Sequence, residues 1–144
     1  MTTIKSYTDI EQSKKLAKIL PIESADMAWC NNSIKGINYT DEYSANLYTV
    51  KDMKDTFDKA LICWDKYWEL IPCWSLAALL NVLPVSCDDE QHCLALINHN
   101  PNEKTEWLCA YEDDKGNLMM ECYADNQIDA CVAMIEKLNE QNLL

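Results

Sequence analysis

The sequence predicts one α+β domain, in which a small antiparallel sheet of about three strands in the C-terminal half packs against helices. Apolar residues recur at helical spacing in four segments, and three later segments have the length and composition of strands. Short connections between those strands favour antiparallel neighbours. The predicted helices cover 8–20, 50–71, 74–83 and 126–141, and the predicted strands cover 93–98, 105–112 and 118–124. No linker divides the 144 residues, so the domain is expected to span 1–144.

The first predicted helix begins with a capping box. The hydroxyl of Thr8 is expected to accept from the first-turn amides while Glu11 reaches back, and Pro21 is expected to end the helix. Residues 26–30 are compatible with a short strand. Turn-forming residues then crowd the chain, which predicts a long irregular loop over 31–48.

The second predicted helix rests on apolar residues at steps of three and four. They are Met53, Phe57, Ala60, Leu61, Trp64, Trp68 and Ile71. A strand over 61–68 is the alternative, because that stretch is rich in aromatic residues. Pro72 is expected to end this element, and Ser75 is expected to cap the helix that follows.

The C-terminal elements carry the clearest signals. Gly116 suits the turn between the second and third strands, because glycine readily takes a positive φ. Either Asp125 or Asn126 is expected to cap the last helix. The apolar stripe of that helix comprises Ile128, Cys131, Val132, Ile135, Leu138 and Leu143.

The charge balance limits the classes of partner. The chain carries 12 lysines, no arginine and 24 acidic residues, for a net charge of −12. Nucleic-acid binding and anionic membranes call for the opposite charge, so direct binding to nucleic acid or to a membrane is not expected. The acidity is interpreted first as a source of solubility; a protein partner is expected but not identified, and one of basic character would fit the charge. Two glycines are too few for a nucleotide-binding loop, and no cofactor is predicted. Homodimerisation, which would cover surplus apolar surface, is a further expectation.

The N-terminus and the cysteines predict a cytoplasmic protein. Charged residues interrupt every apolar run near the N-terminus, and no stretch approaches the ~20 apolar residues of a membrane span. The eight cysteines form no CxxC pair, so they are interpreted as free thiols that act as small buried apolar groups.

Three segments carry a resemblance to other proteins: 8–27 (TDIEQSKKLAKILPIESADM), 71–84 (IPCWSLAALLNVLP) and 124–144 (ADNQIDACVAMIEKLNEQNLL). They resemble a group of uncharacterised small proteins that is frequent in gut anaerobic bacteria, often in mobile or phage-like elements. The matching segments make up a little over a third of the chain. The group has no established activity, so the resemblance implies no catalytic residue.

Two clusters are candidate sites. Cys87, His92, Cys93 and His99 offer ligands that zinc prefers, but their spacing matches no familiar zinc site, and no metal site is predicted. The aromatic residues Trp64, Tyr67, Trp68 and Trp74 are compatible with an interaction or ligand surface. The competing interpretation is that they pack in the core or at a dimer interface.

No catalytic motif is present, so the favoured hypothesis is a non-enzymatic cytoplasmic interaction or accessory protein with an acidic surface. The alternative is a small-molecule-binding or catalytic domain that uses the Trp/Tyr cluster together with His92 or His99. The sequence itself identifies neither a ligand nor a partner.

Overall fold

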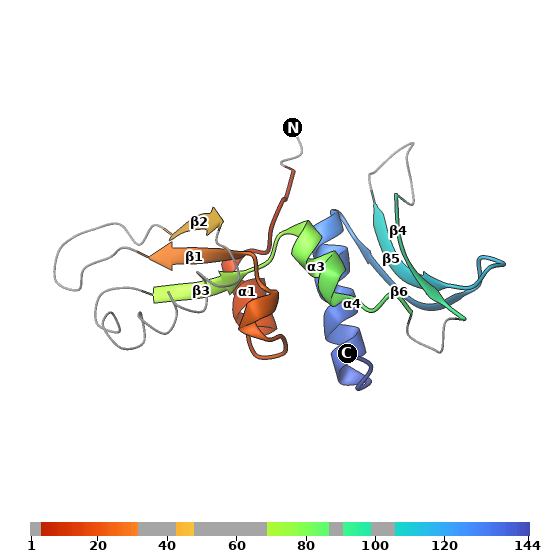
Figure 1. Cartoon of the computed structure of the whole chain (residues 1–144). Helices are drawn as coiled ribbons and strands as arrows, with labels where there is room; N and C mark the ends of the chain where they lie inside the picture. The colour runs from red at the N-terminus through yellow and green to blue at the C-terminus, as the bar shows by residue number, and fades with distance from the viewer. Residues whose placement is uncertain (1–3, 32–42, 48–68, 87–90, 99–105) are drawn as a thin grey trace. The chain divides into compact units, whose positions relative to one another are not determined.

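The computed structural model describes residues 4–31, 43–47, 69–86, 91–98 and 106–144. Within these ranges lie three α-helices and two antiparallel sheets of three strands each (Figure 1), so the α+β prediction is confirmed. The chain forms two compact units. The N-terminal unit is Tyr7–Ala78, and the C-terminal unit combines Met1–Ser6 with Leu79–Leu144. That the whole chain behaves as one domain stays a prediction.

The sheet of the N-terminal unit has the strand order β2-β1-β3. Strand β1 (Met27–Asn31) pairs antiparallel with β2 (Tyr43–Leu47) and with β3 (Glu69–Cys73). The short strand expected near residues 26–30 is therefore present. The irregular loop expected over 31–48 is wrong for its last part, because 43–47 form a strand.

Strand β3 also corrects the expectation for the helix over 50–71. Residues 69–71 are strand, and residues 50–68 lie outside the described ranges. Pro72 was expected to end an element, yet it lies within β3 opposite Ala28. Because β3 is an edge strand, a residue without an N–H is tolerated there.

Helix α1 (Ile10–Leu16) begins one residue later than the predicted capping box requires. Its N-cap is Asp9, whose Oδ1 accepts from the Gln12 amide at 2.8 Å, while the Gln12 side chain accepts from the Asp9 amide at 3.2 Å. The prediction that Thr8 and Glu11 form the box is therefore wrong. Helix α1 packs against β3.

Helix α3 (Leu76–Val82) confirms the predicted helix at 74–83 with tighter bounds. The Ala78 amide donates to the Ser75 Oγ at 3.2 Å, so Ser75 is the N-cap, as predicted. A single 3-10 turn, Ile22–Ser24, precedes β1.

The sheet of the C-terminal unit has the order β4-β5-β6. Strands β4 (Cys93–Asn98) and β6 (Leu118–Ala124) have the predicted bounds, and β5 (Trp107–Glu112) begins two residues later than predicted. Gly116 has φ +81°, as the turn between β5 and β6 requires. Both strand pairs are antiparallel, with an irregularity in register at Tyr111/Glu112.

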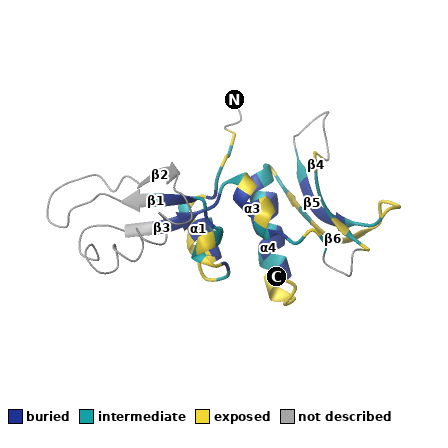
Figure 2. Ribbon diagram, viewed as in Figure 1, coloured by how far each residue is buried: buried dark blue, intermediate teal, exposed yellow. Residues whose placement is uncertain are grey.

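Helix α4 (Gln127–Glu140) packs against β5 and β6 on one face of this sheet (Figure 1). Asn126 is its N-cap and accepts from the Asp129 amide at 2.9 Å. Figure 2 shows buried positions along α4 and β5. The predicted stripe is buried from Ile128 to Leu138, whereas Leu143 is 36% exposed. None of the described helices is long and apolar enough to cross a membrane.

Candidate functional site

The aromatic cluster predicted as a surface has one described member, and it lies in the core. Trp74 is fully buried, and its Nε1 donates to the Ser24 Oγ at 3.0 Å. Trp64, Tyr67 and Trp68 lie outside the described ranges. Trp74 therefore does not serve as an exposed anchor for a partner.

A buried polar network surrounds Thr8 in the N-terminal unit. The Thr8 Oγ1 lies 2.8 Å from the Ser13 Oγ and accepts from the Trp74 amide at 3.1 Å. The Thr8 carbonyl accepts from the Trp29 Nε1 at 3.0 Å and from the Cys73 thiol at 3.4 Å. Thr8 thus connects α1, β1 and β3 through hydrogen bonds, which indicates a structural role.

Cys73 contributes a thiol to this network, and its surroundings do not activate that thiol. Burial raises the pKa of the Cys73 thiol, so the neutral form is favoured at neutral pH. A nucleophilic cysteine requires the opposite, a thiolate stabilised by a neighbouring base or cation. Cys73 therefore fits the core role predicted for the cysteines.

An open depression of about 330 Å³ is lined by Asp9, Ile10, Glu11 and Trp29. Its walls are mostly apolar, and the described lining residues include two carboxylates but no histidine or cysteine. Asp9 is already engaged as the cap of α1. Among the described residues that line the depression there is neither His92 nor Trp74, so it is not the pocket that the alternative hypothesis predicts.

The cluster of cysteines and histidines is only partly described. His92 is half-buried, Cys93 is exposed, and Cys87 and His99 lie outside the described ranges. Across the part of the chain that the structure describes, no three His, Cys, Asp or Glu side chains converge as metal ligands would.

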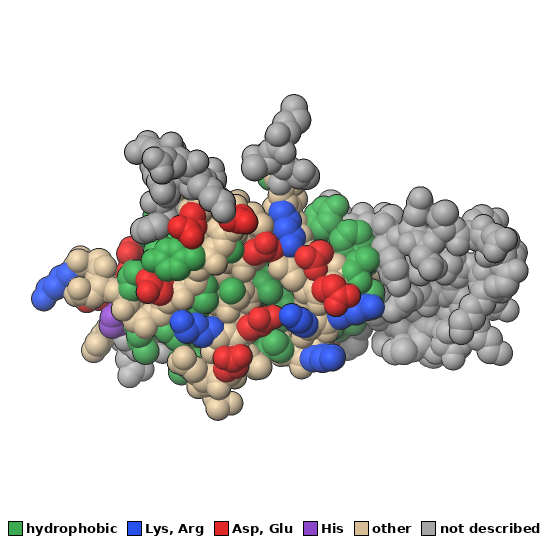
Figure 3. Space-filling model, turned by 180° about the vertical axis from the view of Figure 1, so that it is seen from behind, with side chains coloured by type: hydrophobic (Ala, Val, Ile, Leu, Met, Phe, Trp, Pro, Cys, Tyr) green, Lys and Arg blue, Asp and Glu red, His purple; other side chains and the backbone are tan. Residues whose placement is uncertain are grey.

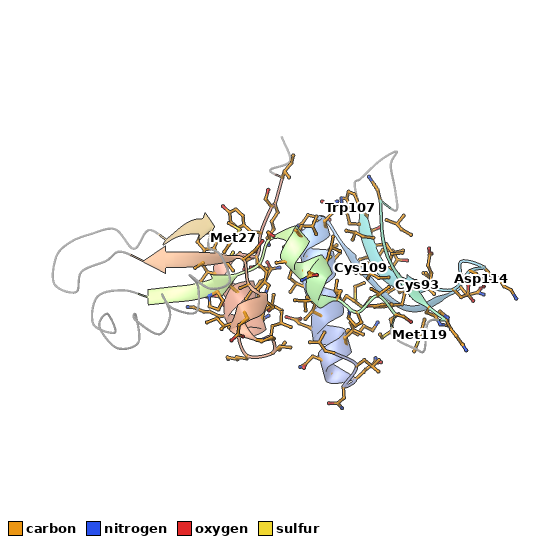
Figure 4. The ribbon with its side chains drawn as sticks, in the orientation of Figure 1. Met27, Cys93, Trp107, Cys109, Asp114 and Met119 are labelled. Carbon is orange, nitrogen blue, oxygen red and sulfur yellow. The ribbon has the colours of Figure 1, made fainter. Side chains whose placement is uncertain are left out.

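The face of the β4-β5-β6 sheet that packs against α4 carries a cluster of thiols. Cys109 on β5, labelled in Figure 4, lies opposite Cys122 on β6 and contacts Cys131 of α4. Cys109 and Cys131 are fully buried. The contact with Cys131 and the loss of solvent raise the pKa of Cys109, which is therefore a neutral core thiol.

The opposite face of the same sheet, here called the outer face, exposes apolar side chains. Residues Ile97, Leu108 and Tyr123 form a row across the three strands. Leu108 in the middle is only 4% exposed, but Ile97 and Tyr123 at the ends are 38% and 43% exposed. Leu118 and Met119, where the register between β5 and β6 shifts, are 39% and 47% exposed. Met119 is labelled in Figure 4. A monomeric sheet normally keeps such a face polar.

Carboxylates accompany these apolar residues. The Tyr123 hydroxyl donates to the Glu121 Oε2 at 3.1 Å, which places both side chains on the outer face. This hydrogen bond, with the negative charges of Glu121 and Glu106, raises the pKa of Tyr123. Glu112 alternates onto the same face, and β4, β5 and β6 contain no lysine. Figure 3, which views the molecule from behind, shows Asp and Glu side chains set among hydrophobic ones on that side of the molecule.

The outer face was not among the predicted sites, although the sequence holds a signal for it. Strand β6 reads Leu-Met-Met-Glu-Cys-Tyr-Ala, and β4 reads Cys-Leu-Ala-Leu-Ile-Asn, so both faces of each strand are largely apolar. In an antiparallel sheet with one wet face, alternate residues would be polar. The missing alternation indicates that the second face also meets something apolar.

Comparison with known proteins adds no family: no family model, curated protein or solved structure matches this chain.

Proposed function

We propose that this chain is a non-enzymatic interaction protein of the cytoplasm, and that it binds a protein partner through the outer face of the β4-β5-β6 sheet. The observation that carries the proposal is the exposure of Ile97, Leu118, Met119 and Tyr123 on a sheet whose other face is already packed against α4. Exposed apolar residues that gather on one surface, with polar groups around them, are typical of interaction sites.

The size of these side chains supports the proposal. Tyr and Met are enriched at protein interfaces, because each offers a large contact area and Tyr adds a polar tip. Tyr123 already directs its hydroxyl to Glu121, so its ring is held across the face and loses little freedom when a partner covers it.

The acidic composition also supports the proposal of a protein partner. A net charge of −12 speeds the encounter with a basic partner and slows the encounter with an acidic one. A role as an acidic accessory protein in a mobile element, as the sequence resemblance suggests, is compatible with this proposal.

The proposal is tested by comparing partner capture between variants of matched chemistry. Ile97→Ser and Tyr123→Ser remove apolar surface from the outer face. Ile4→Ser and Leu144→Ser remove it from positions that are 86% and 45% exposed but lie outside the three strands. Each tagged variant is incubated with extract of the native host, and retained proteins are quantified by mass spectrometry.

We expect at least one protein to be retained by the wild-type chain and by both controls, and to fall about tenfold with each outer-face variant. A tenfold loss corresponds to ~1.4 kcal/mol, an ordinary value for truncating a buried interface side chain. Equal retention by all five chains would contradict the proposal, provided that circular dichroism shows every variant folded.

A further inference from the structure

Strand β4 is an edge of its sheet. Its only paired neighbour among the described strands is β5. On the far side, the Leu94 amide donates to the Val85 carbonyl at 2.9 Å, and Ser86 forms an isolated bridge with Cys93. The segment at 85–86 therefore covers only the start of β4 and leaves the stretch from Ala95 to Asn98 at the edge.

The direction of the Leu94 amide fixes which backbone groups point outward. Because N–H and C=O groups alternate between the two sides of a strand, those of Leu96 and Asn98 point to the same side as those of Leu94. Within the described ranges, no hydrogen bond joins these two amides to another residue. The edge thus offers a short ladder to an incoming strand.

Strand β4 lacks the features that usually protect an edge. It contains no lysine, no proline and no charged residue, and its pairing with β5 runs without a register shift. Natural sheets protect their edges with inward charges, prolines or bulges, because an open flat edge pairs with other chains. The absence of every one of these features favours an edge that a partner covers.

The charges indicate which partner. Two copies of this chain would each bring a net charge of −12 to a β4–β4 contact. A strand added along Ala95–Asn98 lies about 10 Å from β5. The carboxylate at that end of β5 belongs to Glu106, just before Trp107, and its charge acts on Tyr123 of the outer face. Cationic side chains on alternate positions of the added strand would face this carboxylate.

We propose that the partner docks as an extended segment bearing alternate Lys or Arg residues, which adds to the sheet along β4 and lays its cationic side chains over the outer face. This inference rests on the proposed function and states how that surface is occupied. Main-chain hydrogen bonds to Leu96 and Asn98 supply affinity, and a cationic side chain near Glu106 supplies selectivity.

The test is a titration of the full-length ¹⁵N-labelled chain with three short synthetic peptides, followed by NMR. In the first peptide Lys and Val alternate, in the second Glu replaces Lys, and in the third every backbone nitrogen of the Lys/Val peptide is methylated. Methylation removes the backbone donors and blocks strand pairing while the side chains and their charges remain.

We expect the Lys/Val peptide to shift the amide signals of Leu96 and Asn98 and to slow their hydrogen exchange. The methylated peptide is expected to bind about tenfold more weakly, and the Glu/Val peptide weaker still. An Asn98→Pro variant, which removes one outward N–H at the end of the strand, is expected to bind the Lys/Val peptide more weakly. Asn98→Ala keeps that N–H and is expected to bind the peptide as the wild-type chain does.

Each other outcome overturns part of the proposal. Equal binding of the methylated peptide would exclude strand addition, and equal binding of the Glu/Val peptide would exclude a cationic segment. A chain that pairs with itself through β4, seen as a dimer by light scattering without peptide, would exclude this occupant, as would no binding of the Lys/Val peptide. If partner capture still depended on Ile97 and Tyr123, the proposed function would stand without this inference.

Discussion

Thr8 shows how one side chain holds several segments of the N-terminal unit together. Its hydroxyl and carbonyl contact Ser13, Trp29, Cys73 and Trp74, and Thr8 and Ser13 are both fully buried. Buried polar groups are stable only when their hydrogen bonds are made, and in the described part of the chain no buried side-chain N or O atom lacks a partner.

Replacing Thr8 by Val tests this role. The shape is kept, but the Trp74 amide and the Ser13 hydroxyl each lose their hydrogen-bond partner. An unsatisfied buried polar group costs about 1–3 kcal/mol, so we expect Thr8→Val to lower the free energy of unfolding by at least that amount, measured in urea. Thr8→Ser keeps the hydroxyl and is expected to lower the free energy of unfolding by less. Equal losses in the two variants would contradict the role of the hydroxyl.

Tyr123 offers a second test on the scale of a residue, because its titration reports the electrostatics of the outer face. The hydrogen bond to Glu121 favours the neutral phenol, so the pKa of Tyr123 is raised. Glu121→Gln removes the negative charge and is expected to lower the pKa of Tyr123, so that the phenol ionises at lower pH.

This titration is measurable by NMR of ¹³C-labelled tyrosine rings, with the Tyr123 signal assigned by its loss in Tyr123→Phe. Glu136→Gln on α4 is the matched control, since Glu136 is absent from the groups that act on Tyr123. A pKa that stays the same in Glu121→Gln would contradict the arrangement of side chains on the outer face.

Among the secondary-structure elements, α4 depends most visibly on its cap. Asn126 Oδ1 accepts from the Asp129 amide, and the sequence alone left Asp125 and Asn126 as alternatives. Losing an N-cap acceptor costs about 1 kcal/mol, so we expect Asn126→Ala to destabilise the chain by that amount. Asn126→Ser keeps a side-chain acceptor without placing a second carboxylate beside Asp129, to which the Asn126 Nδ2 donates at 2.7 Å, and is expected to lower the stability less in thermal or urea unfolding. A loss of stability in Asn126→Ser as large as in Asn126→Ala would contradict the assignment.

The elements that could be predicted are those whose signals are local. Strands β4 and β6 and helix α4 each lie between turn or capping residues, such as Gly116 and Asn126. Strands β2 and β3 are harder to predict, because each is stabilised by pairing with β1, and no local sequence pattern predicts which segments will pair. Pro72 wrongly predicted the end of an element for the same reason, because only the sheet order shows that it lies on an edge strand, where proline is tolerated.

Residue type alone does not predict the outer face. Trp is the most conspicuous interface residue in a sequence, so residue type favours the segment from Trp64 to Trp74. Trp74 is instead a core residue with a satisfied indole N–H. The informative signal was a missing polar alternation in β4 and β6, which gains meaning only when α4 is known to cover the other face.

On the scale of the whole molecule, the excess of acidic residues carries a cost. A net charge of −12 on 144 residues makes the folded chain repel itself, and this repulsion is stronger in the folded state, where the charges are closer together. Described ion pairs relieve only a small part of it, as between Lys5 and Asp129 at 2.7 Å. Salt ions screen such repulsion between exposed charges over about 10 Å at 0.1 M.

The charge therefore predicts a stability that rises with salt. Between low ionic strength and about 0.2 M of a neutral salt, we expect the thermal midpoint to increase by several degrees, which corresponds to about 1 kcal/mol for a chain of this size. NaCl and KCl are expected to act equally, because screening depends on ionic strength and not on a specific ion site. The measurement is thermal unfolding followed by circular dichroism. A midpoint that falls with salt would show that attractive pairs outweigh the repulsion, and the charge argument for a basic partner would weaken with it.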